Sequence, residues 1–372
     1  MTRILYVSTS TTVGGAEKTV FSLATLLDHK RFTVTGVVSL KPFGAYAERL
    51  AAMGSKTFTL GMKSRPGMKE VRALCAIIER ERPDVVHAVM YQAIQLSRWV
   101  KKRLAGKVRF RLVSSPRVNY RTRAAWTLLL DRLLKGQDDL LIAESQASRD
   151  FLVQRLGYAP AKVKTIYNGV ELARWEVSKL ERQHKRMELR LGSDDILIGA
   201  VGRLDPQKGY PALIDAVAKL RAKHPVRCVI IGEGPQRAKL EEQIRRLHLE
   251  RHVWLLGETS DVPTWLSALE IVVLPSLWEG LPNSLLEAMA IGQPVVACAV
   301  DGVPEAVTHE VTGLLVPPRD VAALTRAIER LILDPALRAK LGAAAKEATA
   351  KKFALVDMMA RYEQAYAEVM SR

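Results

Sequence analysis

Residues 270–287 read EIVVLPSLWEGLPNSLLE, an apolar run of strand length followed by a short loop and the start of a helix. Gly280 and Pro282 are typical turn residues, and we expect the helix to begin around Asn283 or Ser284. A buried strand that leads through a short loop into a helix is the repeating unit of parallel α/β sheets. The stretch therefore predicts that fold class.

The same alternation of strand-like and helical segments extends along nearly the whole chain. Apolar runs of strand length lie at 4–8, 33–38, 84–89, 110–115 and 139–144 in the first half and at 196–202, 228–234, 252–258, 270–276 and 294–299 in the second. Helical spacing of apolar residues occurs between them, for example at 15–28, 68–82 and 145–156. Repeated units of this kind predict doubly wound parallel sheets, whose ligands bind at the carboxyl ends of the strands.

Length and charge together predict two domains. The chain has 372 residues and a formal net charge of +17, and residues 1–180 hold 31 Lys and Arg against 14 Asp and Glu. Residues 181–372 hold 25 of each, so all of the excess lies in the first half. With the polar stretch 171–194, this break places the boundary near residue 175. The basic half predicts an anionic partner, which is nucleic acid, an acidic soluble substrate or an anionic membrane surface.

The sequence also bears on compartment. It has no run of about 18 apolar residues that would cross a membrane, and its amino terminus MTRILYVSTS leads directly into a strand without a cleavable signal. We therefore expect a cytoplasmic protein. Cys75, Cys228 and Cys298 lie in apolar stretches without CxxC spacing, so we expect buried reduced thiols.

Two loops of the second half carry groups suited to an anionic ligand. GRLDPQKG places Arg203 and Lys208 just beyond the apolar run 196–202. A guanidinium fork and a mobile ammonium together match a diphosphate, although two solvated loop cations are the alternative. GEGP, after the next run, allows close backbone approach but is also ordinary turn chemistry.

The loop in EGLPNSLLE carries two carboxylates, Glu279 and Glu287. A helix start has unpaired amides that favour anions. For Glu287 the alternative is structural, because Ser284 to Glu287 fits the S-x-x-E capping box. Glu279 is harder to explain in this way, since a carboxylate in an apolar loop needs a partner, which a hydroxylated ligand would supply.

Near the amino terminus, Gly14 and Gly15 lie between the first apolar run and the first helical segment. Glycines at this place let a phosphate approach the backbone. The pattern is not the G-x-G-x-x-G fingerprint, so a nicotinamide enzyme is not supported.

The ordered motifs resemble those of glycosyltransferase family 4, retaining enzymes of the GT-B fold. They are GGAE at 14–17, NGV at 168–170, GRLDPQKG at 202–209, GEGP at 232–235, EGLPNSLLE at 279–287, GVPE at 302–305 and GLLV at 313–316. The resemblance implies two Rossmann-like domains facing each other across a cleft. Residues 1–175 would bind the acceptor, residues 176–352 would bind the nucleotide sugar, and a helix in 353–372 would return to the first domain.

The resemblance also implies residue roles. Arg203 and Lys208 would hold the donor diphosphate, Glu279 the hydroxyls of the donor sugar, and Glu287 the ribose diol. Further donor contacts would come from Thr259, which faces the base, and from Gly14, Gly15, Gly280, Leu281, Pro282, Asn283, Ser284 and Leu285. Leaving-group stabilisation is the main contribution expected of the protein.

The first domain departs from the family pattern at one place. Many relatives have a histidine after the fourth or fifth strand, where this chain has Pro116 and Arg117. His87 matches a neighbouring family histidine and is a candidate catalytic residue, with a packed histidine as the alternative. Arg117 is a candidate contact for an anionic acceptor.

Cations gather in residues 98–135, where Arg117, Arg121, Arg123 and Arg132 flank Trp126 and several leucines. A basic amphipathic segment with an aromatic residue suits the surface of an anionic membrane. A core helix with a solvated charged face is the alternative. Since many relatives elongate lipid-linked glycans, we expect a peripheral protein at the cytoplasmic face.

The resulting prediction is transfer of a hexosyl or N-acetylhexosaminyl group from a UDP-sugar to a glycan or lipid-linked acceptor. GDP-mannose as donor and a small soluble acceptor are alternatives, as are epimerase or phosphorylase chemistry. No D-x-D motif occurs, so we expect metal-independent activity and no cofactor. Nucleic acid is not expected as a partner, because aromatics are only 6% of the chain and no binding motif is present.

Overall fold

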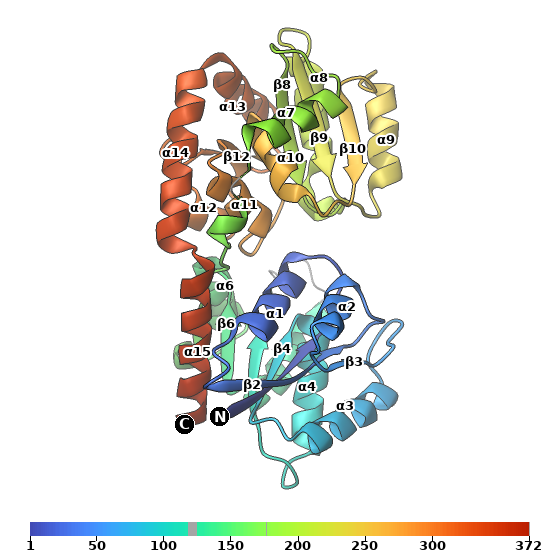
Figure 1. The fold of residues 1–372 in the computed structure, drawn as a ribbon. Coiled ribbons are helices and arrows are strands. Elements are labelled where there is room, and N and C mark those ends of the chain that lie inside the picture. The colour runs from blue at the N-terminus through green and yellow to red at the C-terminus, as the bar shows by residue number, and fades with distance from the viewer. Residues whose placement is uncertain (118–124, 176, 372) are drawn as a thin grey trace. The chain divides into compact units, whose positions relative to one another are not determined.

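The computed structural model describes residues 1–117, 125–175 and 177–371. The chain forms two compact units (Figure 1). Unit 1 comprises Met1–Asn168 and Val356–Arg372, and unit 2 comprises Gly169–Leu355. The division between the units falls at residues 168 and 169, before the predicted position at 175. The whole polar stretch 171–194 therefore belongs to unit 2. The last helix belongs to unit 1.

Unit 1 is built on a seven-stranded sheet in the order β3-β2-β1-β4-β5-β6-β7, in which all pairs are parallel. The strands are β1 Thr2–Ser8, β2 Phe32–Ser39, β3 Thr57–Thr59, β4 Val85–Val89, β5 Arg111–Ser115, β6 Leu140–Ala143 and β7 Val163–Thr165. Strand order reverses between β1 and β4, the point where ligands bind in such sheets.

Helices cover both faces of this sheet. They are α1 Gly15–Leu26, α2 Ala45–Ala52, α3 Met68–Glu81, α4 Tyr91–Arg103, α5 Ala125–Leu134, α6 Gln146–Asp150 and α15 Leu355–Ser371. Apolar side chains of α3 and α4, such as Leu74 and Ile94, pack in one cluster with Leu5 and Val7 of β1. Tyr6, which points to the opposite face, lies against Tyr366 of α15.

Unit 2 repeats the plan with a six-stranded parallel sheet in the order β10-β9-β8-β11-β12-β13. The strands are β8 Ile196–Val201, β9 Val226–Ile231, β10 Val253–Gly257, β11 Ile271–Leu274, β12 Val295–Cys298 and β13 Leu314–Val316. Here the order reverses between β8 and β11. The prediction of two doubly wound parallel sheets is therefore confirmed.

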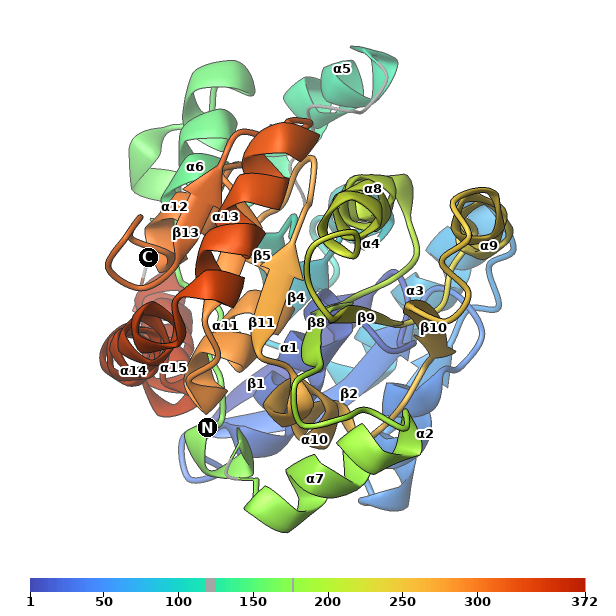
Figure 2. The same ribbon diagram turned by 90° about the horizontal axis from the view of Figure 1, so that it is seen from above.

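The helices of unit 2 form two groups. They are α7 Lys179–Glu188, α8 Tyr210–Leu220, α9 Arg237–Arg246, α10 Val262–Ala268, α11 Asn283–Ile291, α12 Val303–Ala306, α13 Val321–Leu333 and α14 Pro335–Lys352. One group has α8 packed on α9 and α13, and the other has α10 and α11 packed with α7 and α14 (Figure 2). Glu270 fastens α7 by accepting hydrogen bonds from Arg182 and Arg186 at 2.6 and 2.8 Å.

Three strands were missing from the prediction. Each of β3, β7 and β13 has three residues, which is too short for an alternating or continuous apolar pattern to be recognised. The helix expected at 145–156 is α6 followed by a π-helical turn over Phe151–Arg155. The three cysteines are buried and unpaired, as predicted.

Candidate functional site

The loops after β8 and β11 meet at the reversal point of the unit 2 sheet. The amide of Leu277 donates to the carbonyl of Gln207 at 2.8 Å, and the Gln207 side chain donates to the carbonyl of Trp278 at 2.9 Å. Gly209 makes this approach possible. It is left-handed, with φ of 65°, and a Cβ there would lie 2.1 Å from the Pro275 carbonyl oxygen.

This meeting of loops brings Lys208 and Glu279 together. Lys208 Nζ lies 2.6 Å from Glu279 Oε1, and the two side chains are 16% and 6% exposed. Buried Ser276 donates its hydroxyl to the same oxygen at 2.8 Å, and Gln207 Nε2 lies 3.3 Å from Glu279 Oε2. The partner that Glu279 was expected to need is therefore supplied by the protein itself.

A third loop, which follows β12, also contacts the loop that carries Glu279. Asp301 accepts the amide hydrogen of Glu279 at 2.9 Å, and the amide of Gly302 donates to the carbonyl of Gly280 at 3.1 Å. Gly302 begins the GVPE motif, whose local role is to fix the EGLP turn. Sequence reasoning missed Asp301, Gln207 and Ser276, although Gln207 lies inside the GRLDPQKG motif and the other two lie within three residues of a predicted motif.

Arg203 differs from Lys208 in its surroundings. Its side chain is 68% exposed, and Nη2 donates to Asp205 Oδ2 at 2.5 Å. An exposed pair of this kind contributes little to stability, so the guanidinium is available for an anion at small cost. The two predicted phosphate contacts therefore consist of one buried ammonium held in place and one exposed guanidinium.

The capping-box alternative for Glu287 is not realised. Helix α11 starts at Asn283 with Pro282 in the capping position, so Ser284 lies within the first turn and does not cap the helix. Glu287 lies in the second turn and is 8% exposed. The first amides of the helix, those of Asn283 and Ser284, lie at the helix end that favours an anion.

Thr259 lies in the loop after the edge strand β10, where its hydroxyl accepts the amide hydrogen of Asp261 at 3.1 Å. The neighbouring strand β9 is followed by the GEGP turn. The backbone carbonyl of Glu233 in this turn accepts the amide hydrogen of Leu204 at 2.8 Å. The GEGP turn is thus packed directly on the loop that carries Arg203.

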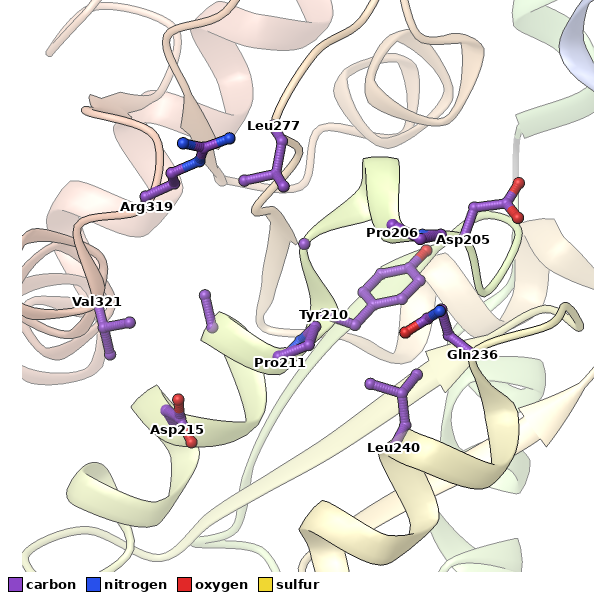
Figure 3. A pocket seen from close by; sticks show the side chains of 12 residues that line it. Asp205, Pro206, Tyr210, Pro211, Asp215, Gln236, Leu240, Leu277, Arg319 and Val321 are labelled. Carbon is purple, nitrogen blue, oxygen red and sulfur yellow. The ribbon is translucent and has the colours of Figure 1, made fainter. Parts of the chain in front are cut away.

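A cavity of about 330 Å³ lies beside the β8 loop (Figure 3). Tyr210, Leu240 and Val321 contribute to a largely apolar wall between α8, α9 and the start of α13. None of the predicted site residues lines it. The charged groups that suit a nucleotide sugar therefore gather outside this cavity, in the loops after β8 and β11.

In unit 1, Gly14 and Gly15 lie at the start of α1, as the sequence indicates. A Cβ on Gly14 would lie 2.4 Å from Glu17 Oε2, so the buried Glu17 fills the space that a side chain would need. Glu17 in turn accepts a hydrogen bond from the Ser10 hydroxyl. The side chain of Glu17 thus fills the space beside Gly14 and bonds to Ser10, so the contacts of the GGAE motif are local to the end of β1.

His87 lies within β4 and is fully buried. Its two ring nitrogens are each 2.8 Å from a hydroxyl, Nδ1 from that of Tyr366 and Nε2 from that of Ser115. Burial, together with the nearby Arg117 cation, lowers the pKa of His87 to about 3. This geometry favours the packed-histidine alternative, since both nitrogens are used inside unit 1.

Arg117, expected to contact an acceptor, is buried in unit 1 and 9% exposed. It has a left-handed backbone with φ of 63°, and its guanidinium donates to Asn168 and, at 2.7 Å, to the hydroxyl of Tyr362. It therefore connects the end of β5 with α15 and with the last residue of the first segment. The contacts observed for this side chain are internal to unit 1.

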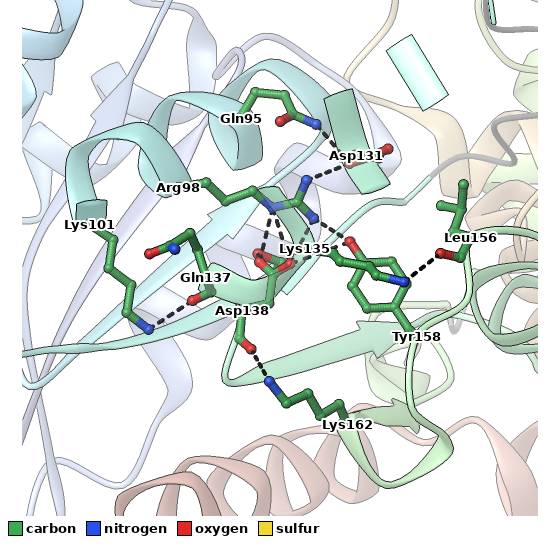
Figure 4. Close-up of polar contacts among 11 residues, drawn as sticks. Gln95, Arg98, Lys101, Asp131, Lys135, Gln137, Asp138, Leu156, Tyr158 and Lys162 are labelled. Carbon is green, nitrogen blue, oxygen red and sulfur yellow. Dashed lines mark hydrogen bonds and ion pairs between the residues drawn. The ribbon is translucent and has the colours of Figure 1, made fainter. Parts of the chain in front are cut away.

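Some of the cations in residues 98–135 form ion pairs within unit 1. Arg98 is 1% exposed and contacts Asp131 of α5 at 2.5 Å and Asp138 at 2.7 Å (Figure 4). Burial raises the pKa of Asp131, although Arg98 opposes that shift. Lys101 pairs with Asp139. The network fastens α5 to α4 and removes these charges from the surface.

Helix α5 nevertheless has an exposed apolar side. Leu129 and Leu133, one turn apart, are 56% and 71% exposed, and Arg132 lies between them in sequence. Leu128 of the same helix packs against a buried cluster of unit 1, so α5 combines the core contacts of the alternative interpretation with two exposed leucines. Arg121, Arg123 and the side chain of Trp126 lie outside the described part of the chain.

The described residues contain neither a membrane-spanning helix nor a cluster of metal ligands. No helix there is both long and apolar enough to span a bilayer. Likewise, no group of three or more His, Cys, Asp or Glu side chains is arranged to hold a metal ion within residues 1–117, 125–175 and 177–371.

Family models match the chain in succession. Residues 13–174 match the model described as Glycosyltransferase Family 4, and residues 181–348 match Glycosyl transferases group 1. The chain belongs to glycosyltransferase family 4. The resemblance of its motifs to that family is thereby confirmed.

Individual family members show the extent of the likeness. An uncharacterized glycosyltransferase, MJ1607 of Methanocaldococcus jannaschii, is 33% identical over 52% of this chain and 50% of its own length. The UDP-Gal:alpha-D-GlcNAc-diphosphoundecaprenol alpha-1,3-galactosyltransferase of Escherichia coli is 27% identical over 73% of this chain and 72% of its own. The match with the first of these relatives thus spans only half of that protein.

Among solved structures, Anabaena Alr3699/HepE in complex with UDP-glucose is 25% identical. The superposition covers 99% of this chain and 100% of that one, with a TM-score of 0.88. Both units of this chain therefore have the folds found in that solved structure.

Proposed function

We propose that the protein is a retaining glycosyltransferase that moves a hexosyl or N-acetylhexosaminyl group from a UDP-sugar to a glycan or lipid-linked acceptor. The observation that carries this proposal is the pair of partly exposed Lys208 and buried Glu279 at the reversal point of the unit 2 sheet. Such a pair offers a cation for a leaving diphosphate and a carboxylate for sugar hydroxyls at adjacent positions.

The predicted donor contacts in the loops after β8 and β11 have separate roles in this scheme. Lys208 and Arg203 neutralise the diphosphate, and Glu279 accepts hydrogen bonds from the donor sugar. The first amides of α11 face the phosphates, and Glu287 accepts hydrogen bonds from the ribose. Ser276 and Gln207 hold the Glu279 carboxylate in one orientation through the hydrogen bonds described above.

The reaction requires no protein nucleophile. The acceptor oxygen attacks the anomeric carbon on the face from which UDP departs, and the bond between that carbon and the phosphate oxygen breaks. The acceptor proton passes to a β-phosphate oxygen. Lys208 stabilises the negative charge that develops on the leaving group, and we expect the reaction to proceed without a metal ion.

Two likenesses support the choice of donor and acceptor. The Anabaena relative was solved in complex with UDP-glucose, and the Escherichia coli relative is named for a UDP-Gal donor and a diphosphoundecaprenol-linked acceptor. These likenesses support the proposal of transfer to a lipid-linked glycan in cell-surface polysaccharide or glycoconjugate synthesis. GDP-mannose and a small soluble acceptor are the alternatives.

The test is a binding and hydrolysis screen with UDP, GDP and ADP and their sugars, run with and without EDTA. We expect UDP to raise the melting temperature most and EDTA to change no rate. In Glu279→Gln, UDP should bind within about twofold of wild type while affinity for the UDP-sugar falls about tenfold. Equal losses for UDP and UDP-sugar would contradict the role of Glu279.

The exposed side of α5 supports a peripheral position at the cytoplasmic face of an anionic membrane. Leu129 and Leu133 would enter the bilayer surface, with cations of unit 1 near the headgroups. In sedimentation with anionic vesicles, Leu129→Ser with Leu133→Ser should reduce binding about tenfold. The matched control is Leu180→Ser with Met187→Ser on α7, two residues that are also exposed.

A further inference from the structure

The loop that follows β12 contains a residue other than glycine in the left-handed region of backbone conformation. This residue is Asp301, with φ of 43°. A side chain in this region meets a steric cost that glycine avoids, and aspartate and asparagine are the other residues that tolerate it best. The loop is anchored to the sheet, because the amide of Ala299 donates to the carbonyl of Val316 in β13 at 2.8 Å. This fixed position therefore holds a side chain where glycine would suit the backbone better.

The side chain of Asp301 makes a contact that glycine could not make. Its Oδ2 accepts the amide hydrogen of Glu279 at 2.9 Å, across 22 positions of sequence. A hydrogen bond from an amide to a carboxylate is stronger than one to a neutral acceptor. The next residue, Gly302, donates its amide hydrogen to the Gly280 carbonyl at 3.1 Å. Two neighbouring residues of the β12 loop thus bind two neighbouring residues of the loop after β11.

Glu279 is therefore held at both ends by different groups. Its carboxylate contacts Lys208, Ser276 and Gln207. Those contacts compete with a donor, because the ammonium would turn to the diphosphate and sugar hydroxyls would donate to the same carboxylate oxygens. The amide contact with Asp301 uses no atom assigned to the donor. It is therefore the contact that persists when the donor is bound.

We infer that Asp301 is a positioning residue for recognition of the donor sugar. It fixes the backbone at Glu279, so that the carboxylate of that side chain reaches the sugar hydroxyls. Hydrogen bonds weaken steeply as their geometry departs from the optimum, so a small shift of this backbone lowers affinity for the sugar but not for the nucleotide. This inference rests on the proposed function, since Asp301 acts only through the contact of Glu279 with the donor sugar.

The experiment measures binding of UDP, UDP-glucose and UDP-N-acetylglucosamine to the full chain, and the UDP-sugar that wild type binds more tightly is used for the variants. Asp301→Gly relaxes the backbone and removes the carboxylate. Its affinity for UDP should stay within about twofold of wild type, while its affinity for the UDP-sugar falls about fivefold. Asp301→Asn keeps an acceptor oxygen and tolerates the same backbone, so it should restore UDP-sugar affinity to within about twofold of wild type.

The matched control is Arg190→Gly, because Arg190 is an exposed left-handed residue of unit 2 with φ of 53°. This change relaxes a backbone in the same way and should leave both affinities within about twofold of wild type. A double-mutant cycle with Glu279→Gln then tests whether Asp301 acts through Glu279. In that case, adding Asp301→Gly to Glu279→Gln should weaken UDP-sugar binding by less than about twofold.

Several results would overturn the inference. An unchanged UDP-sugar affinity in Asp301→Gly would leave the residue without a role, and equal losses for UDP and the UDP-sugar would indicate general damage to unit 2. A loss that Asp301→Asn does not restore would exclude the hydrogen bond to the Glu279 amide as its cause. Additive losses in the double variant would mean that Asp301 acts independently of Glu279. The proposed function fails separately if wild type binds none of the three nucleotides, or if Glu279→Gln binds the UDP-sugar as tightly as wild type.

Discussion

The two sheets share one topology but differ in the chemistry of their carboxyl edges. In unit 2, a cation and a carboxylate are paired and nearly buried, with Lys208 and Glu279 held by neighbouring loops. In unit 1, exposed cations lie in the loops after β2 and β3, while the polar groups His87 and Arg117 are used in internal packing. The same fold therefore presents one edge with a paired cation and carboxylate and another edge with exposed cations.

We therefore expect residues of the two units to differ in the property that their substitution changes, turnover or stability. A residue of the unit 2 edge should influence turnover far more than stability. A buried polar residue of unit 1 should influence stability and leave donor binding intact. The following four variants test that separation, and the size of the expected effect decreases from one to the next.

Lys208→Ala should have the largest effect. Removing the cation that we propose to stabilise the leaving diphosphate should lower kcat about 10² to 10³-fold, as loss of a preorganised oxyanion contact does. The measurement is the initial rate of sugar transfer or UDP-sugar hydrolysis. Lys219→Ala, which removes an exposed lysine of α8, is the control. An unchanged rate in Lys208→Ala would refute its role in leaving-group stabilisation.

Arg117→Ala should lower the free energy of unfolding by about 2 to 3 kcal/mol, because it removes buried hydrogen bonds from a cation to Asn168 and Tyr362. Affinity for UDP should stay within about twofold. The comparison variant is Arg82→Ala, at another left-handed arginine that is exposed. If Arg117→Ala is as stable as Arg82→Ala but has a raised acceptor KM, then Arg117 contacts the acceptor.

We expect His87 to make the free energy of unfolding depend on pH. Its pKa is lowered to about 3 in the folded protein by burial and by Arg117, so the unfolded chain binds the extra proton first, near pH 6.5. The stabilisation is therefore full above about pH 6.5 and is lost as pH falls toward 3. Between pH 7 and pH 5 the loss should be about 2 kcal/mol.

Urea unfolding of wild type and His87→Gln at pH 7 and pH 5 measures this difference. The variant should lose about 2 kcal/mol less than wild type over the same interval. The comparison of pH intervals removes any constant cost of the substitution. Parallel losses in the two proteins would mean that His87 titrates near its ordinary pKa, which would place it in contact with solvent.

The sequence predicted the unit 2 edge better than the unit 1 edge, for a physical reason. The loops that carry Lys208 and Glu279 directly follow strands with clear apolar runs, so the position of the loops follows from the order of elements. The pairing of these two side chains depends on Gly209, whose left-handed backbone and closeness to Pro275 appear only in three dimensions. The sequence therefore predicted that Lys208 and Glu279 lie in the site, but it did not predict that their side chains are in contact.

In unit 1, the roles of His87 and Arg117 could not be predicted because their partners are distant in sequence. Tyr362 and Tyr366 lie on α15, which joins unit 1 after the whole of unit 2 has been traversed. The three-residue strands were missed because local pattern carries too little information over such lengths. Contacts across long sequence separations thus account for most of what the sequence did not predict.

Arg203→Gln should have the smallest effect and should sharpen the contrast within the unit 2 edge. The guanidinium is 68% exposed and pairs with Asp205, and exposed pairs contribute about 0 to 1 kcal/mol to stability. The melting temperature should therefore be unchanged, while affinity for UDP falls about tenfold from the loss of one phosphate contact. Thermal unfolding and titration with UDP measure the two quantities. If both kcat and stability fell as far as in Lys208→Ala, the exposed arginine and the buried lysine would not have the separate roles that the structure gives them.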